Sequence, residues 1–133
     1  MQNKIVVRYQ DGRLKKGYTS DFMPNKDIFH VIAADNPTAA KPVTVNMLEL
    51  KAVFFVKDFV GNSGYNDKKD FDPIKPVSGR KIKVVFKDGE TLVGTTQGYQ
   101  PGRQGFFVFP ADPQSNIERF FVVSLAAKSV SFL

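Results

Sequence analysis

The 133-residue chain contains no cysteine and no tryptophan, and its only histidine is His30. Without cysteine the protein has no disulfide, no thiolate nucleophile and no cysteine-based metal site. A single histidine cannot form a cluster of nitrogen and sulfur ligands around a metal. The sequence therefore contains no recognisable set of metal-binding residues, and we expect no cofactor.

Long apolar runs are also missing. Near the N-terminus only Ile5–Val7 is apolar, and this run is too short for the core of a signal peptide. No stretch approaches the roughly 20 apolar residues that a membrane-spanning helix needs. The absence of cysteine fits a reducing compartment. These features predict a cytoplasmic protein that does not associate with a membrane.

Catalytic motifs are absent from the sequence. It contains no phosphate-binding loop of the Walker or dinucleotide type, and no serine lies in a nucleophile elbow. Gly98–Gly105 is rich in glycine, but no helix is expected after it, and turn chemistry explains it. The acids at 67, 70 and 72 lack the glycine and terminal glutamate of a calcium loop. We predict no enzyme activity and name no catalytic residue.

The chain contains an internal repeat. At an offset of 77 residues, 17 of the 53 residue pairs from position 4 to 56 are identical. Asn3–Gly12 (NKIVVRYQDG), for example, corresponds to Arg80–Gly89 (RKIKVVFKDG). We therefore expect a first repeat at 1–56, a connector at 57–79 and a second repeat at 80–133. Two units this small should pack on each other or on a partner.

Each repeat is predicted to form five short strands. Apolar and polar residues alternate with a period of two at the start of each repeat, and an Asp-Gly pair follows that is typical of a type I′ hairpin turn. A single helical turn is expected at 47–50 and at 124–127. The expected strands are 5–10, 14–22, 28–33, 43–46 and 51–56, then 82–87, 91–99, 105–109, 119–123 and 128–133.

This plan is that of a small SH3-like or Sm-like barrel. The predicted fold is all-β, with two tandem five-stranded barrels related by internal duplication. An open meander or a sandwich is the alternative. The connector could pack across the barrels through Phe59, Tyr65, Phe71 and Ile74.

Three pairs of adjacent phenylalanines lie inside expected strands: Phe54-Phe55, Phe106-Phe107 and Phe120-Phe121. Neighbours on a strand point to opposite faces, so one ring of each pair can fill a barrel core. The other ring must be covered by the second repeat or the connector, by a second copy of the protein, or by a stacked base. We name Phe54, Phe107 and Phe120 as candidate interface residues.

The formal net charge is +6 and the isoelectric point is about 9.6. Such a balance favours a polyanionic partner, although lysines on edge strands also protect against aggregation. The candidate polyanion-binding residues lie mostly in the first hairpin of each repeat: Arg8, Arg13, Lys15, Lys16, Arg80, Lys81, Lys83, Lys87 and Arg103. A pocket between the barrels lined by Arg103 or Arg119 would instead indicate a small ligand.

The segment Ile5–Val31 (IVVRYQDGRLKKGYTSDFMPNKDIFHV) resembles the first signature of Sm-like barrels, through its Asp-Gly-Arg turn and its Asn25-bearing loop. In that family the asparagine loop binds RNA together with an Arg-Gly or Lys-Gly pair in a second signature. The corresponding region, Asn46–Phe55 (NMLELKAVFF), has no such pair, and the second repeat has Gly102 in place of Asn25. The resemblance therefore implies the barrel fold without the RNA-binding pattern.

Ile82–Val108 is similar to PilZ-type barrels, which bind cyclic dinucleotides. It lacks their two arginines four residues apart and their Asp/Asn-x-Ser-x-x-Gly strand, so the similarity implies the fold alone. The whole pattern, with the run Glu49–Phe55 (ELKAVFF), resembles uncharacterised bacterial proteins with two small barrels, a family that supplies no activity.

The expected function is a non-catalytic interaction or regulatory module, with another protein or a second copy as its partner. One alternative is a protein that binds RNA or single-stranded nucleic acid. The other is a receptor for a cyclic dinucleotide or another small ligand.

Overall fold

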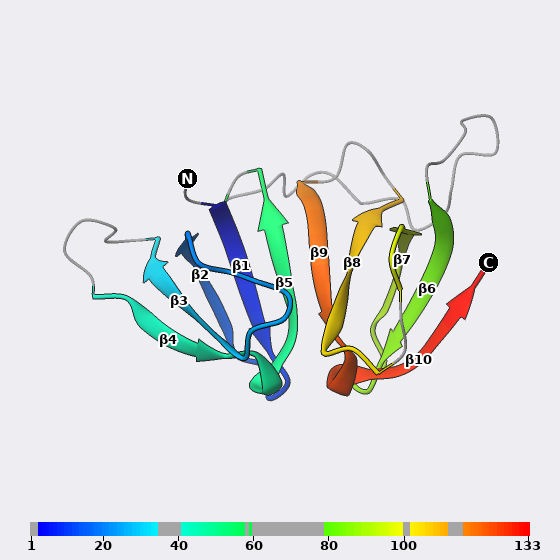
Figure 1. Ribbon diagram of the computed structural model, residues 1–133, viewed down its shortest axis with the longest axis horizontal. Coiled ribbons are helices and arrows are strands. Elements are labelled where there is room, and N and C mark those ends of the chain that lie inside the picture. Colours follow the sequence, from blue (N-terminus) through cyan, green and yellow to red (C-terminus); the bar gives the residue numbers. More distant parts are fainter. Residues whose placement is uncertain (1–2, 35–40, 58, 60–78, 100–101, 112–115) are drawn as a thin grey trace.

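The protein is an all-β molecule with almost no helix, as its computed structural model shows (Figure 1). The structure describes residues 3–34, 41–57, 59, 79–99, 102–111 and 116–133. Two 3-10 helices, η1 (Met47–Glu49) and η2 (Ser124–Ala126), each precede a strand. The strands are β1 (Asn3–Tyr9), β2 (Leu14–Thr19), β3 (Ile28–Ala33), β4 (Val43–Asn46), β5 (Leu50–Val56), β6 (Arg80–Phe86), β7 (Thr91–Thr96), β8 (Gly105–Pro110), β9 (Ile117–Val123) and β10 (Ala127–Phe132).

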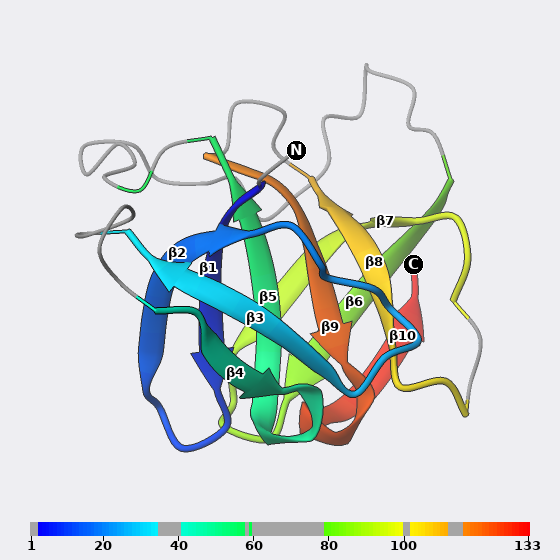
Figure 2. The same ribbon diagram turned by 60° about the vertical axis from the view of Figure 1, so that its left-hand side comes forward.

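These ten strands form one open antiparallel sheet in the order β10-β6-β7-β8-β9-β5-β1-β2-β3-β4. β5 and β9 lie side by side through the middle of the molecule (Figure 2) and join the two sets of five strands. We call this junction the β5–β9 seam. The pairing does not show two separate five-stranded barrels, and it is closer to the open alternative. β4 and β10 are the two edge strands.

The two sets of five strands have the same order and closely matching local geometry. Each set follows the order fifth-first-second-third-fourth along the sheet. Gly17 and Gly94 occupy equivalent places, because a Cβ atom at either would collide with a backbone carbonyl oxygen of the neighbouring strand, that of Ile32 or of Phe109. Both positions therefore require glycine for the second and third strands to approach closely.

The Asp-Gly turns are not the predicted type I′ turns. That type needs a positive φ at both central residues. Among the described residues only glycines have positive φ, and Gly12 and Gly89 both have 95°. The Gly12 N–H donates to the Tyr9 carbonyl (3.1 Å) and the Tyr9 N–H donates to the Arg13 carbonyl (3.0 Å), which makes a three-residue loop. The carboxylate of Asp11 accepts a local bond from the Arg13 N–H (3.0 Å), which favours this longer turn.

Most strand positions predicted from the sequence are confirmed. The expected strands at 28–33 and 43–46 have the same bounds, and both expected helical turns are present as η1 and η2. β2 ends at Thr19 rather than at residue 22, because the Asp21 carboxylate already bonds to the His30 N–H of β3 (2.9 Å). Most of the connector lies outside the described residues, including Tyr65, Phe71 and Ile74. Phe59 is described, and its ring meets the Tyr18 ring edge-on at 5.2 Å.

Two apolar cores lie on opposite faces of the β5–β9 seam. Alternate residues of β5 enter different cores, since Phe54 packs with strands of the second set and Phe55 packs with strands of the first set. In β9 Phe120 and Phe121 divide in the same way. Both rings of these two pairs are buried, so each set of strands covers the phenylalanine that a lone barrel of the other set would leave outside. Each core is thus completed by a strand of the other half.

Candidate binding groove beside the seam

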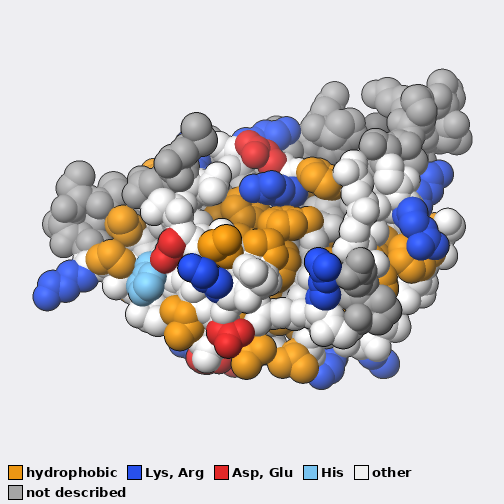
Figure 3. Space-filling view, in the orientation of Figure 1, with side chains coloured by type: hydrophobic (Ala, Val, Ile, Leu, Met, Phe, Trp, Pro, Cys, Tyr) orange, Lys and Arg blue, Asp and Glu red, His pale blue; other side chains and the backbone are white. Residues whose placement is uncertain are grey.

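A groove of about 380 Å³ lies where β8 and β9 meet the loop after β2. Its position corresponds to the middle of the face in Figure 3, where hydrophobic side chains gather with basic side chains beside them. This volume is in the range of small-molecule sites. The lining residues are Pro24, Gln97, Gly98, Arg103, Gly105, Phe106, Phe107, Phe109, Arg119 and Phe121.

Aromatic rings form the floor of the groove. Phe107 and Phe121 meet edge-on with their ring centroids 5.1 Å apart, and Phe22 from the first half packs edge-on against both. Phe109 lies at the rim and is 41% exposed. Gly105 allows β8 to lie close to β9, because a Cβ atom there would collide with the Phe121 ring. The floor is therefore a rigid apolar surface with one exposed ring at its edge.

Arg119 lies over this aromatic floor. Its guanidinium carbon is 4.6 Å from the ring centroid of Phe55 and 4.9 Å from that of Phe107. Two rings therefore hold the flat guanidinium in one orientation while its side chain remains half-buried. A preoriented arginine loses little conformational entropy when it binds an anion.

Arg103 stands in the loop that enters β8, and its backbone is anchored. The Arg103 carbonyl accepts a hydrogen bond from the Ser124 hydroxyl (2.8 Å). Next to it, the Gln104 side chain donates to the carbonyls of Pro24 (3.2 Å) and Lys26 (2.9 Å) in the first half. These bonds hold the loops of both halves together at the mouth of the groove.

The groove combines two guanidinium groups with exposed aromatic surface. None of its described lining residues carries a carboxylate, so neither Arg103 nor Arg119 meets an acid within the groove. Guanidinium groups bind phosphate and carboxylate oxygens, often through two parallel hydrogen bonds. Phenylalanine rings stack on flat rings of a ligand. The groove therefore suits an anion that carries a planar ring.

A second polar cluster lies where the β6–β7 turn meets β5. Lys51 is 7% exposed, and its ammonium group donates to the carboxylates of Asp88 (2.7 Å) and Glu90. Arg8 forms a further ion pair with Glu90 (3.3 Å). The hydrogen bond from Lys51 is the main reason that the pKa of Asp88 is lowered from its ordinary value. Because these charges neutralise one another, the cluster fastens the two halves together and offers little charge to a ligand.

His30 forms an exposed pair with Asp21. Its Nδ1 atom lies 2.6 Å from the Asp21 carboxylate, which also accepts a hydrogen bond from the Thr19 hydroxyl (3.1 Å). Partial burial raises the pKa of Asp21, but the hydrogen bonds from His30 and Thr19 outweigh this and lower the pKa overall. This pair bonds the loop after β2 to β3. Within the described ranges no group of three His, Asp or Glu residues is placed to hold a metal ion.

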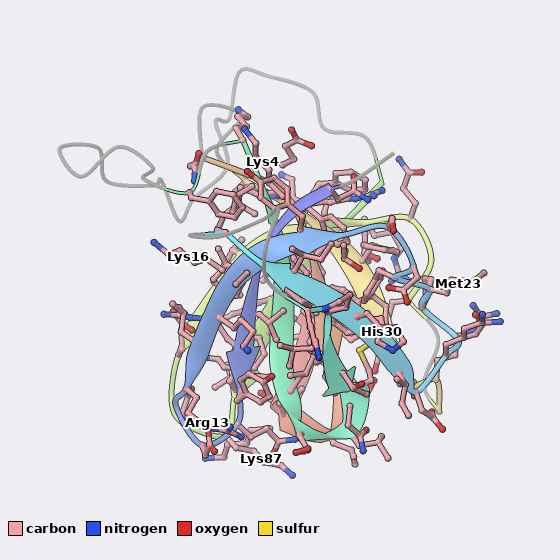
Figure 4. All side chains as sticks on the ribbon, turned by 90° about the vertical axis from the view of Figure 1, so that its left-hand side faces the viewer. Lys4, Arg13, Lys16, Met23, His30 and Lys87 are labelled. Atoms are coloured by element: carbon pink, nitrogen blue, oxygen red, sulfur yellow. The ribbon has the colours of Figure 1, made fainter. Side chains whose placement is uncertain are left out.

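The structure does not gather the candidate polyanion-binding residues at one site. Arg8 and Arg13 line one pocket and Arg13 and Lys15 line another, each beside acidic residues. Arg13 and Lys87 lie at one end of the molecule, whereas Lys16 lies about halfway along one side (Figure 4). Arg13 is paired with Asp11 (2.7 Å), and the Lys16 ammonium donates to the Phe59 carbonyl (3.0 Å). Arg8 forms an ion pair with Glu90, Arg80 stacks on the Phe132 ring, and Lys81 also has an interaction partner. Lys15 and Lys83 lie apart on β2 and β6.

Arg103 is the one member of that set in the groove. Of the candidate interface residues, Phe54 and Phe120 are buried against each other at the seam, with ring centroids 5.7 Å apart. Phe107 is half-buried and lines the groove. Arg119 was expected only as a possible lining residue of a small-ligand pocket, alongside Arg103, and both line the groove. Arg119 directly precedes the Phe120-Phe121 pair, and this adjacency is the signal that could have placed it.

Comparison with known proteins gives one match. Residues 1–133 match DUF6982, a family of unknown function. The chain belongs to this family. Neither the curated proteins nor the solved structures yielded a match. In the described part of the DUF6982 chain, no helix is long and apolar enough to cross a membrane.

Proposed function

We propose that this DUF6982 protein is a non-catalytic binding module, and that the groove beside the seam receives a small anion with a planar ring, such as a nucleotide. The observation that carries the proposal is the Arg119 guanidinium held over Phe55 and Phe107. Arg103 supplies a second positive charge across the same groove. The proposal also retains the interpretation of the chain as a duplicated unit.

A small ligand fits the groove better than a long nucleic-acid strand. A strand is bound along a continuous basic path with aromatic rings at intervals. Here Arg8 and Arg13 of the first hairpin are already paired with acids, and the turns of the two hairpins meet at a pocket that Asp88 and Glu90 also line. The groove, by contrast, has two arginines and no acid among its described lining residues.

Calorimetric titration of the whole protein tests the proposal. The probes are cyclic di-GMP, which offers two phosphates and two bases, GMP, and guanosine as the uncharged comparison. We expect at least one nucleotide to bind and guanosine to bind far more weakly. Arg119→Gln should weaken nucleotide binding about 10- to 100-fold, because each charge-assisted hydrogen bond contributes about 1.5–3 kcal/mol.

Arg80→Gln is the matched control. Arg80 also stacks on a phenylalanine, Phe132 at 3.7 Å, but lies outside the groove. It should leave nucleotide affinity unchanged. The proposal fails if no nucleotide binds, if both arginine variants lose affinity equally, or if the protein binds a single-stranded RNA oligonucleotide and none of the nucleotides.

A further inference from the structure

We infer that the protein associates with copies of itself head to tail, with the β10 edge of one copy pairing with the β4 edge of the next. The sheet already contains one such junction within the chain. β5, the fifth strand of the first set, pairs with β9, the fourth strand of the second set. Their counterparts at an offset of 77 residues are β10 and β4, which are the two open edges. The inference does not depend on the groove.

The equivalence of the two halves extends to single backbone bonds. The Tyr9 N–H donates to Arg13 and the equivalent Phe86 N–H donates to Glu90; in the same way, the Ala34 N–H donates to Lys16 and the Ala111 N–H donates to Val93. The backbone of β3, which pairs with β4, therefore has nearly the same geometry as that of β8, which pairs with β9. In the same way, β6 beside β10 matches β1 beside β5. Three of the five residue pairs of the internal junction have both counterparts within β10 and β4, because β4 has four residues where β9 has seven.

The internal register predicts the external one. Within the chain Val53 faces Phe121 and Phe54 faces Phe120. The counterparts would place Val130 of one copy opposite Thr44 of the next, and Ser131 opposite Val43. Both edges hold exposed apolar side chains that such pairing would cover, since Val43 is 37% exposed and Phe132 is 39% exposed.

The hydrogen-bonding groups of both edges are free for this pairing. The Met47 N–H donates to Asp27 on the β3 side, so the alternation along β4 directs the Thr44 N–H to the open side. The Leu133 N–H donates to Lys81 of β6, so the Phe132 backbone faces away from β6. Within the described part of the chain, no other strand pairs with these edges.

Charge also repeats at the external junction, but more weakly. Internally Lys51 of β5 binds Asp88 and Glu90 of the β6–β7 turn. At an offset of 77 residues, Lys128 corresponds to Lys51 and Asp11 corresponds to Asp88. Glu90 corresponds to Arg13. One attraction between opposite charges is therefore kept, and the other becomes a repulsion between like charges. Ser131 also takes the position that Phe54 has in the seam. The association should therefore be reversible and weaker than the internal junction.

Because the contact is heterologous, it can propagate into a closed ring or an open filament. Sedimentation velocity of the full chain over a roughly hundredfold range of concentration measures it. We expect the average mass to rise with concentration. Thr44→Pro removes the outward N–H of β4 without removing a β3 bond, and should abolish growth through that edge. Thr44→Val keeps the N–H and is the matched control.

Mixing separates this arrangement from a symmetric dimer. Thr44→Pro blocks β4, and Phe132→Pro blocks the outward side of β10. Each variant alone should remain a monomer, and an equimolar mixture should form a one-to-one dimer through the two intact edges. Thr44→Lys, which leaves the backbone unchanged, replaces Thr44→Pro if that variant does not fold. A monomeric wild-type protein at all concentrations, or an assembly that survives both edge variants, would overturn the inference.

Discussion

Phe120→Ala should destabilise the whole ten-stranded sheet rather than one half of it. Phe120 is 2% exposed and belongs to the core that strands of both halves share. Removing a buried phenylalanine ring costs about 3–5 kcal/mol through lost transfer energy and the cavity left behind. That is a large share of the roughly 5–15 kcal/mol that stabilises a typical domain. Its ring also packs on Phe54, so the two substitutions should couple by about 0.5–1.5 kcal/mol in a double-mutant cycle.

Urea unfolding followed by circular dichroism measures the loss, and Phe109→Ala is the control. Phe109 is 41% exposed, so its removal should cost about 1 kcal/mol or less. Amide hydrogen exchange then locates the effect, and β2 in the first half should lose protection together with β7 in the second. A Phe120→Ala variant that unfolds in two steps, with β2 protection unchanged, would refute the reasoning that the seam makes both halves one cooperative unit.

Three further predictions follow from the packing and the ion pairs. Gly105→Ala should destabilise the protein by about 1–3 kcal/mol in the same assay, because its methyl group would collide with the Phe121 ring. Lys51→Met should cost about 1 kcal/mol, since its exposed acidic partners can rehydrate, whereas Lys128→Met at the equivalent position should be neutral. The pKa of Asp88 is lowered from its ordinary value of 3.8, so its ionised carboxylate stabilises the folded state when the pH is above 3.8. Stability should therefore fall as the pH drops below 3.8, and it should fall less steeply in Asp88→Asn.

The strands could be predicted from the sequence because their signals are local. Alternation with a period of two marks β1 and β6, and glycine and proline mark the turns. The seam could not be predicted in the same way, because strand order depends on contacts between distant residues. A signal for it was nevertheless present. β5 reads LKAVFFV and is buried at every position, which is typical of a central strand with both faces covered.

The candidate site was only partly predictable. Counting basic residues favoured the two first hairpins, but several of their side chains are paired with acids or stacked on rings within the chain. Arg119 belongs to a strand whose neighbours come from both halves, and its rings are supplied by β5 and β8. Only the register of β9 against both strands brings those three elements together. Local sequence carries no information on that register.

The most direct test of the groove is nuclear magnetic resonance of the five arginine side chains during a nucleotide titration. Each Nε–H group gives its own signal, so the three arginines outside the groove are internal controls. The account predicts that the signals of Arg103 and Arg119 shift together, with one shared dissociation constant, while those of Arg8, Arg13 and Arg80 stay in place. Equal shifts of all five signals would indicate diffuse attraction to a basic surface, and that result would contradict a defined binding groove.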